Sequence, residues 1–154
     1  QQLDLDLAKE FKAIQPELAK MDVNYIALVV GSIKERATFV SDFWDLSHFF
    51  FTSPTTYDEK ASKKALKEGT VDILNKVSAL ANATDSFTVE NLQTNIKGWI
   101  TTNEISFGKV MMPLRLALVG ALQGPDVFDI MFIIGKEETV KRIESLMKFM
   151  NSSK

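Results

Sequence analysis

The chain has 154 residues, of which 45% are hydrophobic and 25% are charged, with a formal net charge of −2 and no cysteine. This composition is typical of a globular chain with one average domain or two small ones, and it argues against a disordered protein. The lack of cysteine excludes disulfides, thiolate metal sites and cysteine nucleophiles, and it is consistent with a reducing compartment.

The first third of the chain predicts two helices followed by a boundary. Residues 21–51 follow helical periodicity throughout, and a second helix is expected to start at Thr38. The residues expected on the inward stripes are Tyr25, Leu28, Val29, Ile33, Val40, Phe43, Trp44 and Phe50. Pro54 disfavours the helical conformation at Ser53, so the second helix should end there. We therefore expect a boundary at residues 52–56, which separates a first subdomain, residues 1–53, from a second, residues 54–154.

The middle of the chain predicts three helices. A short charged helix at residues 57–67 should be capped by Gly69, and Thr70 should cap the next helix. After a turn at residues 82–85, Thr88 is a typical N-cap residue, with Glu90 in the first turn of its helix. The inward positions of the second and third helices are Leu74, Val77 and Ala81, and then Val89, Leu92, Ile96 and Trp99.

The last third predicts three more helices. Residues 108–122 should be helical despite Pro113, which we place near the first turn, where proline is tolerated. Gly124, Pro125 and Asp126 predict a turn that ends with Asp126 as the N-cap of the next helix. Gly135 separates the last two helices, and the final one should bury Val140, Ile143, Met147 and Met150. About eight helices joined by short loops predict an all-α chain.

No residue pattern in the sequence assembles an active site. The nucleotide-binding and hydrolytic motifs GxxxxGK[ST], GxGxxG, GxSxG and HExxH do not occur. His48 is the single histidine, and we assign it to packing or to the surface. The acidic pairs Asp4/Asp6 and Asp42/Asp45 lack the pattern of a calcium loop, and helix ends or solvated faces explain them. We therefore expect no catalytic residue, no metal ligand and no cofactor in this chain.

Membrane insertion is not expected. Asp4 and Asp6 lie near the start without a basic region before an apolar core, so the N-terminus does not have the pattern of a signal peptide. The longest apolar runs, such as residues 128–134, are too short to span a bilayer.

Arg115 is the most informative charged residue. It lies among apolar residues of a predicted helix, where a charge is costly unless it reaches a surface or a partner. The spacing leaves two roles open. The first is a salt bridge to Asp126 or Asp129 that stabilises the helix. The second is a ligand contact, because a guanidinium group offers a planar fork to bases and phosphates.

The turn at residues 123–128 has features of a contact with single-stranded RNA. Gly124 allows a flat partner to approach the backbone, and Pro125 stiffens the turn. The helix that begins near Asp126 presents free N–H groups. Unstacked RNA bases are read by such backbone groups and by apolar or guanidinium planes. An ordinary turn between two helices is the alternative.

The distribution of charge limits how RNA would be bound. Residues 1–54 carry five basic and eight acidic side chains, whereas residues 105–154 carry seven basic and five acidic ones. Phosphate binding usually requires a basic surface, and only the last third of the chain has a positive excess. We therefore expect a few well-placed contacts to RNA and no extended basic surface.

Three segments resemble the C-terminal region of bacterial glutamyl-tRNA synthetases. The most specific begins with GKVMMPLRLALVG at residue 108 and continues through a proline-containing turn into VFDIMFIIGKE. The segments IKERATFVSDFW with FFF, within residues 33–51, and YDEKA at residues 57–61 are similar to the preceding part of that region. In this family, two all-helical subdomains hold the anticodon stem and loop. Catalysis takes place in an N-terminal Rossmann-type domain with HIGH-like and KMSKS-like signatures, neither of which occurs here.

The resemblance implies two packed helical subdomains that form an anticodon-binding bundle without its catalytic domain. The positions that match the anticodon pocket of the family are Arg115, Gly124, Pro125, Val127, Phe128 and Arg36. Asp126 stands where many relatives have a small neutral residue, and we expect it to cap the next helix. The resemblance also implies a cytoplasmic parent enzyme that uses ATP and Mg²⁺ to attach glutamate to its tRNA.

The expected partners are the tRNA for glutamate, through its anticodon loop, and the catalytic domain of the same polypeptide. No membrane partner and no cofactor of the fragment itself are expected, and the chain should be a monomer. The alternative function is a helical protein-interaction domain with no RNA role, whose Phe- and Met-rich faces contact another protein.

Overall fold

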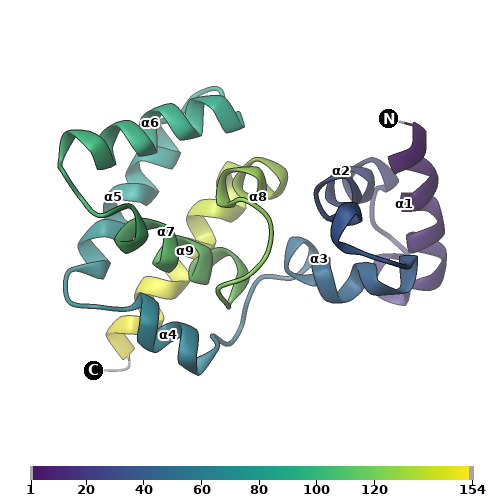
Figure 1. Ribbon diagram of the computed structural model, residues 1–154, viewed down its shortest axis with the longest axis horizontal. Helices are drawn as coiled ribbons and strands as arrows, with labels where there is room; N and C mark the ends of the chain where they lie inside the picture. The colour runs from purple at the N-terminus through teal and green to yellow at the C-terminus, as the bar shows by residue number, and fades with distance from the viewer. Residues whose placement is uncertain (1, 153–154) are drawn as a thin grey trace. The chain divides into compact units, whose positions relative to one another are not determined.

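The computed structural model describes residues 2–152, and within that range it has nine α-helices, three short 3₁₀ helices and no strand (Figure 1). The predicted all-α class is therefore confirmed for this part of the chain. The helices form two compact units, which divide between Thr52 and Ser53.

The first unit contains three α-helices. They are α1 (Gln2–Ile14), α2 (Val23–Ile33) and α3 (Phe43–Phe51), with the 3₁₀ helices η1 (Pro16–Leu18), η2 (Lys34–Arg36) and η3 (Val40–Asp42) between them. Phe11 of α1 is buried and makes edge contacts with Phe43 and Phe51 of α3, at ring-centre distances of 5.4 and 6.3 Å. The hydroxyl of Tyr25 in α2 donates a hydrogen bond to the carbonyl of Phe50 at 2.6 Å. Apolar burial and this bond hold α1, α2 and α3 together.

Two expectations for the first unit were wrong. The chain leaves the helical conformation after Arg36, and α3 begins at Phe43 instead of Thr38. The reason is local, since a carboxylate oxygen of Asp42 accepts the backbone N–H groups of Thr38 and Phe39 at 3.1 and 2.9 Å and stabilises a loop there. Leu28 is 51% exposed, because the inward face of α2 is formed by Ile26, Val29, Val30 and Ile33.

The second unit contains the other six helices. They are α4 (Glu59–Ala65), α5 (Thr70–Ala83), α6 (Val89–Thr102), α7 (Phe107–Val119), α8 (Val127–Ile134) and α9 (Lys136–Ser152). Helix α7 packs against α4, α5, α8 and α9. The predicted inward residues Leu74, Val77 and Ala81 of α5 are fully buried, which confirms that face. Thr88 caps α6 as predicted, because its hydroxyl accepts the N–H of Asn91 at 3.1 Å.

Three details of the second unit differ from the sequence prediction. Gly69 precedes α5 with a φ of 86° instead of capping α4, and Thr70 is the first residue of α5. Pro113 lies in the middle of α7, so the helix lacks the N–H that this position would otherwise contribute. In α9, Val140, Met147 and Met150 are only half-buried. The buried stripe of α9 is instead formed by Thr139, Arg142, Ile143 and Leu146.

Candidate nucleic-acid interface

The connection between α7 and α8, residues 120–126, carries the predicted turn. Helix α7 ends at Val119, earlier than expected, because Gly120 takes a left-handed conformation with a φ of 87° and its N–H bonds to the carbonyl of Leu116 at 2.8 Å. Gly124 has a φ of 108°, which a residue with a side chain rarely adopts. Asp126 accepts the N–H of Phe128 at 2.8 Å, which confirms the predicted N-cap of α8.

Arg115 is hydrogen-bonded to the backbone of this turn. Its Nη1 atom donates to the carbonyls of Gln123, Gly124 and Pro125 at 3.2, 3.1 and 2.6 Å. Hydrogen bonds from a charged donor are stronger than those from a neutral one. Three consecutive carbonyls therefore converge on one guanidinium group of α7.

Five of the six predicted site residues lie in this connection and its flanking helices. Pro125 is buried, and Val127 and Phe128 are only 2% and 1% exposed, so their side chains pack beneath the turn and offer no plane to a ligand. Gly124 is partly accessible and Gln123 is exposed. Arg36, the sixth predicted residue, is exposed at the end of η2 in the other unit.

Comparison with known proteins identifies the family. The family described as "Anticodon binding domain" matches residues 5–147. The chain belongs to the anticodon-binding domain family. Glutamate–tRNA ligases from Christiangramia forsetii and Flavobacterium johnsoniae are 53% and 52% identical to this domain, over 90% and 93% of its length. The crystal structure of a glutamate–tRNA ligase from Elizabethkingia meningosepticum in complex with its amino acid matches 94% of the domain, with 39% identity and a TM-score of 0.86.

The anticodon-binding domain spans only a part of these relatives. It covers 28% of the length of each of the two ligases and 29% of the chain in the crystal structure. The resemblance to glutamyl-tRNA synthetases that the sequence predicted is thus confirmed. The sequence identities and the helical fold agree with a region of these ligases outside their catalytic domain.

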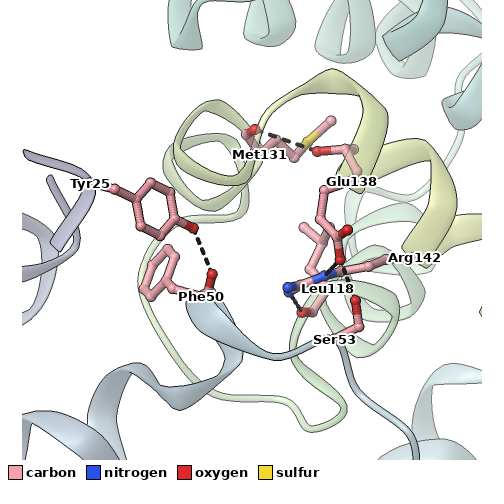
Figure 2. A network of polar contacts seen from close by, with 8 residues as sticks. Tyr25, Phe50, Ser53, Leu118, Met131, Glu138 and Arg142 are labelled. Atoms are coloured by element: carbon pink, nitrogen blue, oxygen red, sulfur yellow. Dashed lines mark hydrogen bonds and ion pairs between the residues drawn. The ribbon is translucent and has the colours of Figure 1, made fainter. Parts of the chain in front are cut away.

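Arg142 is an important residue of the anticodon-binding domain to which sequence reasoning assigned no role. It is 3% exposed, and its guanidinium group donates to the carbonyl of Leu118 and to the carboxylate of Glu138, both at 2.7 Å (Figure 2). The hydroxyl of Ser53 donates to the same oxygen of Glu138. This network joins α9 to the last turn of α7, the helix that carries Arg115. The spacing of Glu138 and Arg142, four residues apart on a helix, is the signal that could have indicated the pair.

Two electrostatic features lie close to α8. The ammonium group of Lys97, on α6, lies 5.6 Å from the ring centre of Phe128 and covers that ring from one side. Burial, and secondarily the negative charge of Asp126, raises the pKa of Asp129. The two acidic groups at the start of α8, Asp126 and Asp129, thus repel each other.

No group of three or more His, Cys, Asp or Glu side chains within residues 2–152 is arranged to hold a metal ion. Within the same residues, no helix is long and apolar enough to cross a bilayer. His48 is exposed, and its ring contacts those of Trp44 and Phe49.

Proposed function

We propose that this domain recognises the anticodon of the tRNA for glutamate, as the C-terminal part of a glutamate–tRNA ligase. The observation that carries the proposal is the turn at residues 123–125, whose three carbonyls are held by Arg115. The domain belongs to the anticodon-binding domain family, and its sequence is similar to those of glutamate–tRNA ligases. Both findings support the same function.

The turn contacts the bases through its backbone, and buried residues hold it in place. Gly124 has no side chain, so an unstacked base can lie against the backbone there. Pro125, Val127 and Phe128 act from below, because their buried packing fixes the position of the turn. Arg115 is in this account a positioning residue that sets the surface read by the bases. Arg36 supplies a separate, exposed cation on the first unit.

The longer protein, we propose, attaches glutamate to this tRNA with ATP and Mg²⁺, using a catalytic domain in the same polypeptide. The anticodon-binding domain aligns the tRNA for that reaction and holds no cofactor itself. We propose further that the protein is cytoplasmic and that the domain is monomeric. The proposed organisation places recognition and catalysis in different parts of one chain.

The test of anticodon recognition is a titration with RNA stem-loops. We expect the chain to bind a stem-loop with the glutamate anticodon more tightly than one with the same stem and exchanged anticodon bases. A lost base contact costs roughly 1–3 kcal/mol, so the affinities should differ by about 5- to 150-fold. Equal affinity for both RNAs would contradict the proposal. A folded sample that binds neither RNA would favour the protein-interaction function.

The chain alone should not catalyse aminoacylation. No nucleotide-binding motif is present in the sequence, so we expect no glutamate-dependent exchange between ATP and pyrophosphate and no charging of tRNA. The measurement is a standard exchange assay on a preparation free of host synthetase. ATP–pyrophosphate exchange activity could co-purify with the chain and disappear when the chain is removed by its affinity tag. Such a result would contradict the division between recognition and catalysis.

A further inference from the structure

A hollow of about 390 Å³ lies beside the turn that we assign to anticodon recognition. Asp58, Lys60 and Lys64 line one side of it, and residues 121–123 line the other. The backbone N–H of Asp58 bonds to the carbonyl of Gly120 at 2.8 Å and ties the two sides together. Gln123 belongs to both features, since it lines the hollow and its carbonyl accepts a hydrogen bond from Arg115. The hollow therefore continues directly into the turn.

The charge of the hollow is positive. Lys60 and Lys64 are exposed and lie one helical turn apart on α4, and within residues 2–152 neither forms an ion pair. Lys63, on the same helix, is different, because its ammonium lies 3.7 Å from the carboxylate of Glu59. Asp58 is the acidic side chain that lines the hollow, and its carboxylate accepts the N–H of Ala61 at 2.9 Å. Two cations thus face one carboxylate that is already engaged in capping α4.

We propose that this hollow binds a phosphate group of the RNA backbone next to the anticodon, with Lys60 and Lys64 as its cationic contacts. The inference rests on the proposed function, because it places the backbone of the same RNA whose bases contact the turn. Phosphate contacts fix the register of a nucleic acid, whereas base contacts specify its sequence. Lysine binds phosphate as a point charge, without the fixed geometry that arginine requires. Since a water molecule occupies roughly 30 Å³ in the liquid, the hollow has room for a hydrated phosphate.

The turn and the hollow have different tasks in RNA binding. The turn at residues 123–125 distinguishes bases, and the two lysines hold the strand without regard to sequence.

The experiment compares the double variant Lys60→Gln/Lys64→Gln with the unmodified chain. Both are titrated with the glutamate anticodon stem-loop and with the exchanged-anticodon stem-loop, at several salt concentrations. Each phosphate contact on a single strand contributes roughly 0.7 to the slope of log affinity against log salt. Because both lysines contact the same phosphate, the slope should become shallower by about 0.7 units in the double variant. The ratio of affinities for the two stem-loops should stay the same.

A matched control is the double variant Lys76→Gln/Lys148→Gln, which removes two exposed lysines from α5 and α9. It should leave the slope within about 0.3 units of the unmodified chain, on the same count of phosphate contacts. If the slope becomes shallower by the same amount in both double variants, RNA affinity depends on net charge alone, and the proposal is overturned. An unchanged slope in Lys60→Gln/Lys64→Gln would also overturn it. Failure of the proposed function is a separate result, since the unmodified chain would then not distinguish the two stem-loops.

Discussion

Replacing Arg142 with alanine is expected to lower the free energy of unfolding by about 3 kcal/mol, because a buried ion pair loses one partner. The substitution removes the donors to the carbonyl of Leu118 and to the carboxylate of Glu138, and it leaves a cavity at a position that is 3% exposed. Removing one member of a buried pair typically costs 3–5 kcal/mol, and we expect the lower end of that range, roughly 3. The reason is that the side chain of Glu138 is 30% exposed, so water partly compensates its charge.

Chemical denaturation of the variant measures this effect, with Lys141→Ala as the matched control. Lys141 precedes Arg142 on α9, but it is exposed, so its loss should change stability by less than about 0.5 kcal/mol. If Arg142→Ala lowers the free energy of unfolding by less than about 1 kcal/mol, the contacts of Arg142 with Leu118 and Glu138 in Figure 2 contribute little to stability.

The same pair has a predictable pH dependence. Partial burial favours the protonated form of Glu138, but hydrogen bonds from Ser53 and Arg142, with the charges of Arg142 and, last in size, Lys141, lower its pKa overall. A carboxylate with a lowered pKa stabilises the fold above its ordinary pKa, and this contribution is lost as the pH falls through the lowered value. The difference in stability between the unmodified chain and Arg142→Ala should therefore narrow on acidification.

Replacing Arg115 with alanine is expected to weaken binding to the glutamate anticodon stem-loop by about 5- to 150-fold, the equivalent of roughly 1–3 kcal/mol. The cause is indirect. Without Nη1, the carbonyls of Gln123, Gly124 and Pro125 lose their common donor, and the turn is free to adopt other shapes. A protein surface that is not held in its RNA-binding conformation binds RNA less tightly. Discrimination between the two anticodons should fall together with affinity.

The measurement on Arg115→Ala combines RNA titration with thermal unfolding. Lys109→Ala is the matched control, because it removes a positive charge from an exposed position of the same helix. It should keep the preference for the glutamate anticodon. If Arg115→Ala is less stable but binds both stem-loops as the unmodified chain does, Arg115 serves only the fold and our assignment is wrong.

Local sequence signals predicted much of the second unit, because caps and turns act over a few residues. Residue type and position predict Thr88 and Asp126 as N-caps, and both form the expected hydrogen bonds. The sequence did not predict α1. Its start, LDLDL, alternates apolar and acidic residues, which hides the helical period, and its fully buried residues are Ala8 and Phe11. A short alternating run is decided by its tertiary partners, and those are remote in sequence.

The sequence predicted where the candidate site lies in the chain, but it did not predict which contacts the residues of the site make. The resemblance placed Val127 and Phe128 at the site, but their orientation depends on packing against the rest of the unit, and the structure buries them. Spacing suggested acidic partners for Arg115, whereas the hydrogen bonds described above go to backbone carbonyls, which have no signature in the sequence. The spacing of Glu138 and Arg142 could have indicated their ion pair, but the bond from Arg142 to the carbonyl of Leu118 has no sequence signal, because Leu118 lies on another helix.

The central claim is that placed contacts to the anticodon, more than a general attraction to phosphates, provide the affinity for RNA. The most direct test is to titrate the chain with the glutamate stem-loop and the exchanged-anticodon stem-loop across a series of salt concentrations. The net charge of −2 leaves few cations for phosphates, so we predict weak binding with a shallow slope of about −2 to −4 in log affinity against log salt. Exchanging the anticodon should reduce affinity more than a moderate rise in salt does. A steep slope with no sensitivity to the anticodon would contradict the claim.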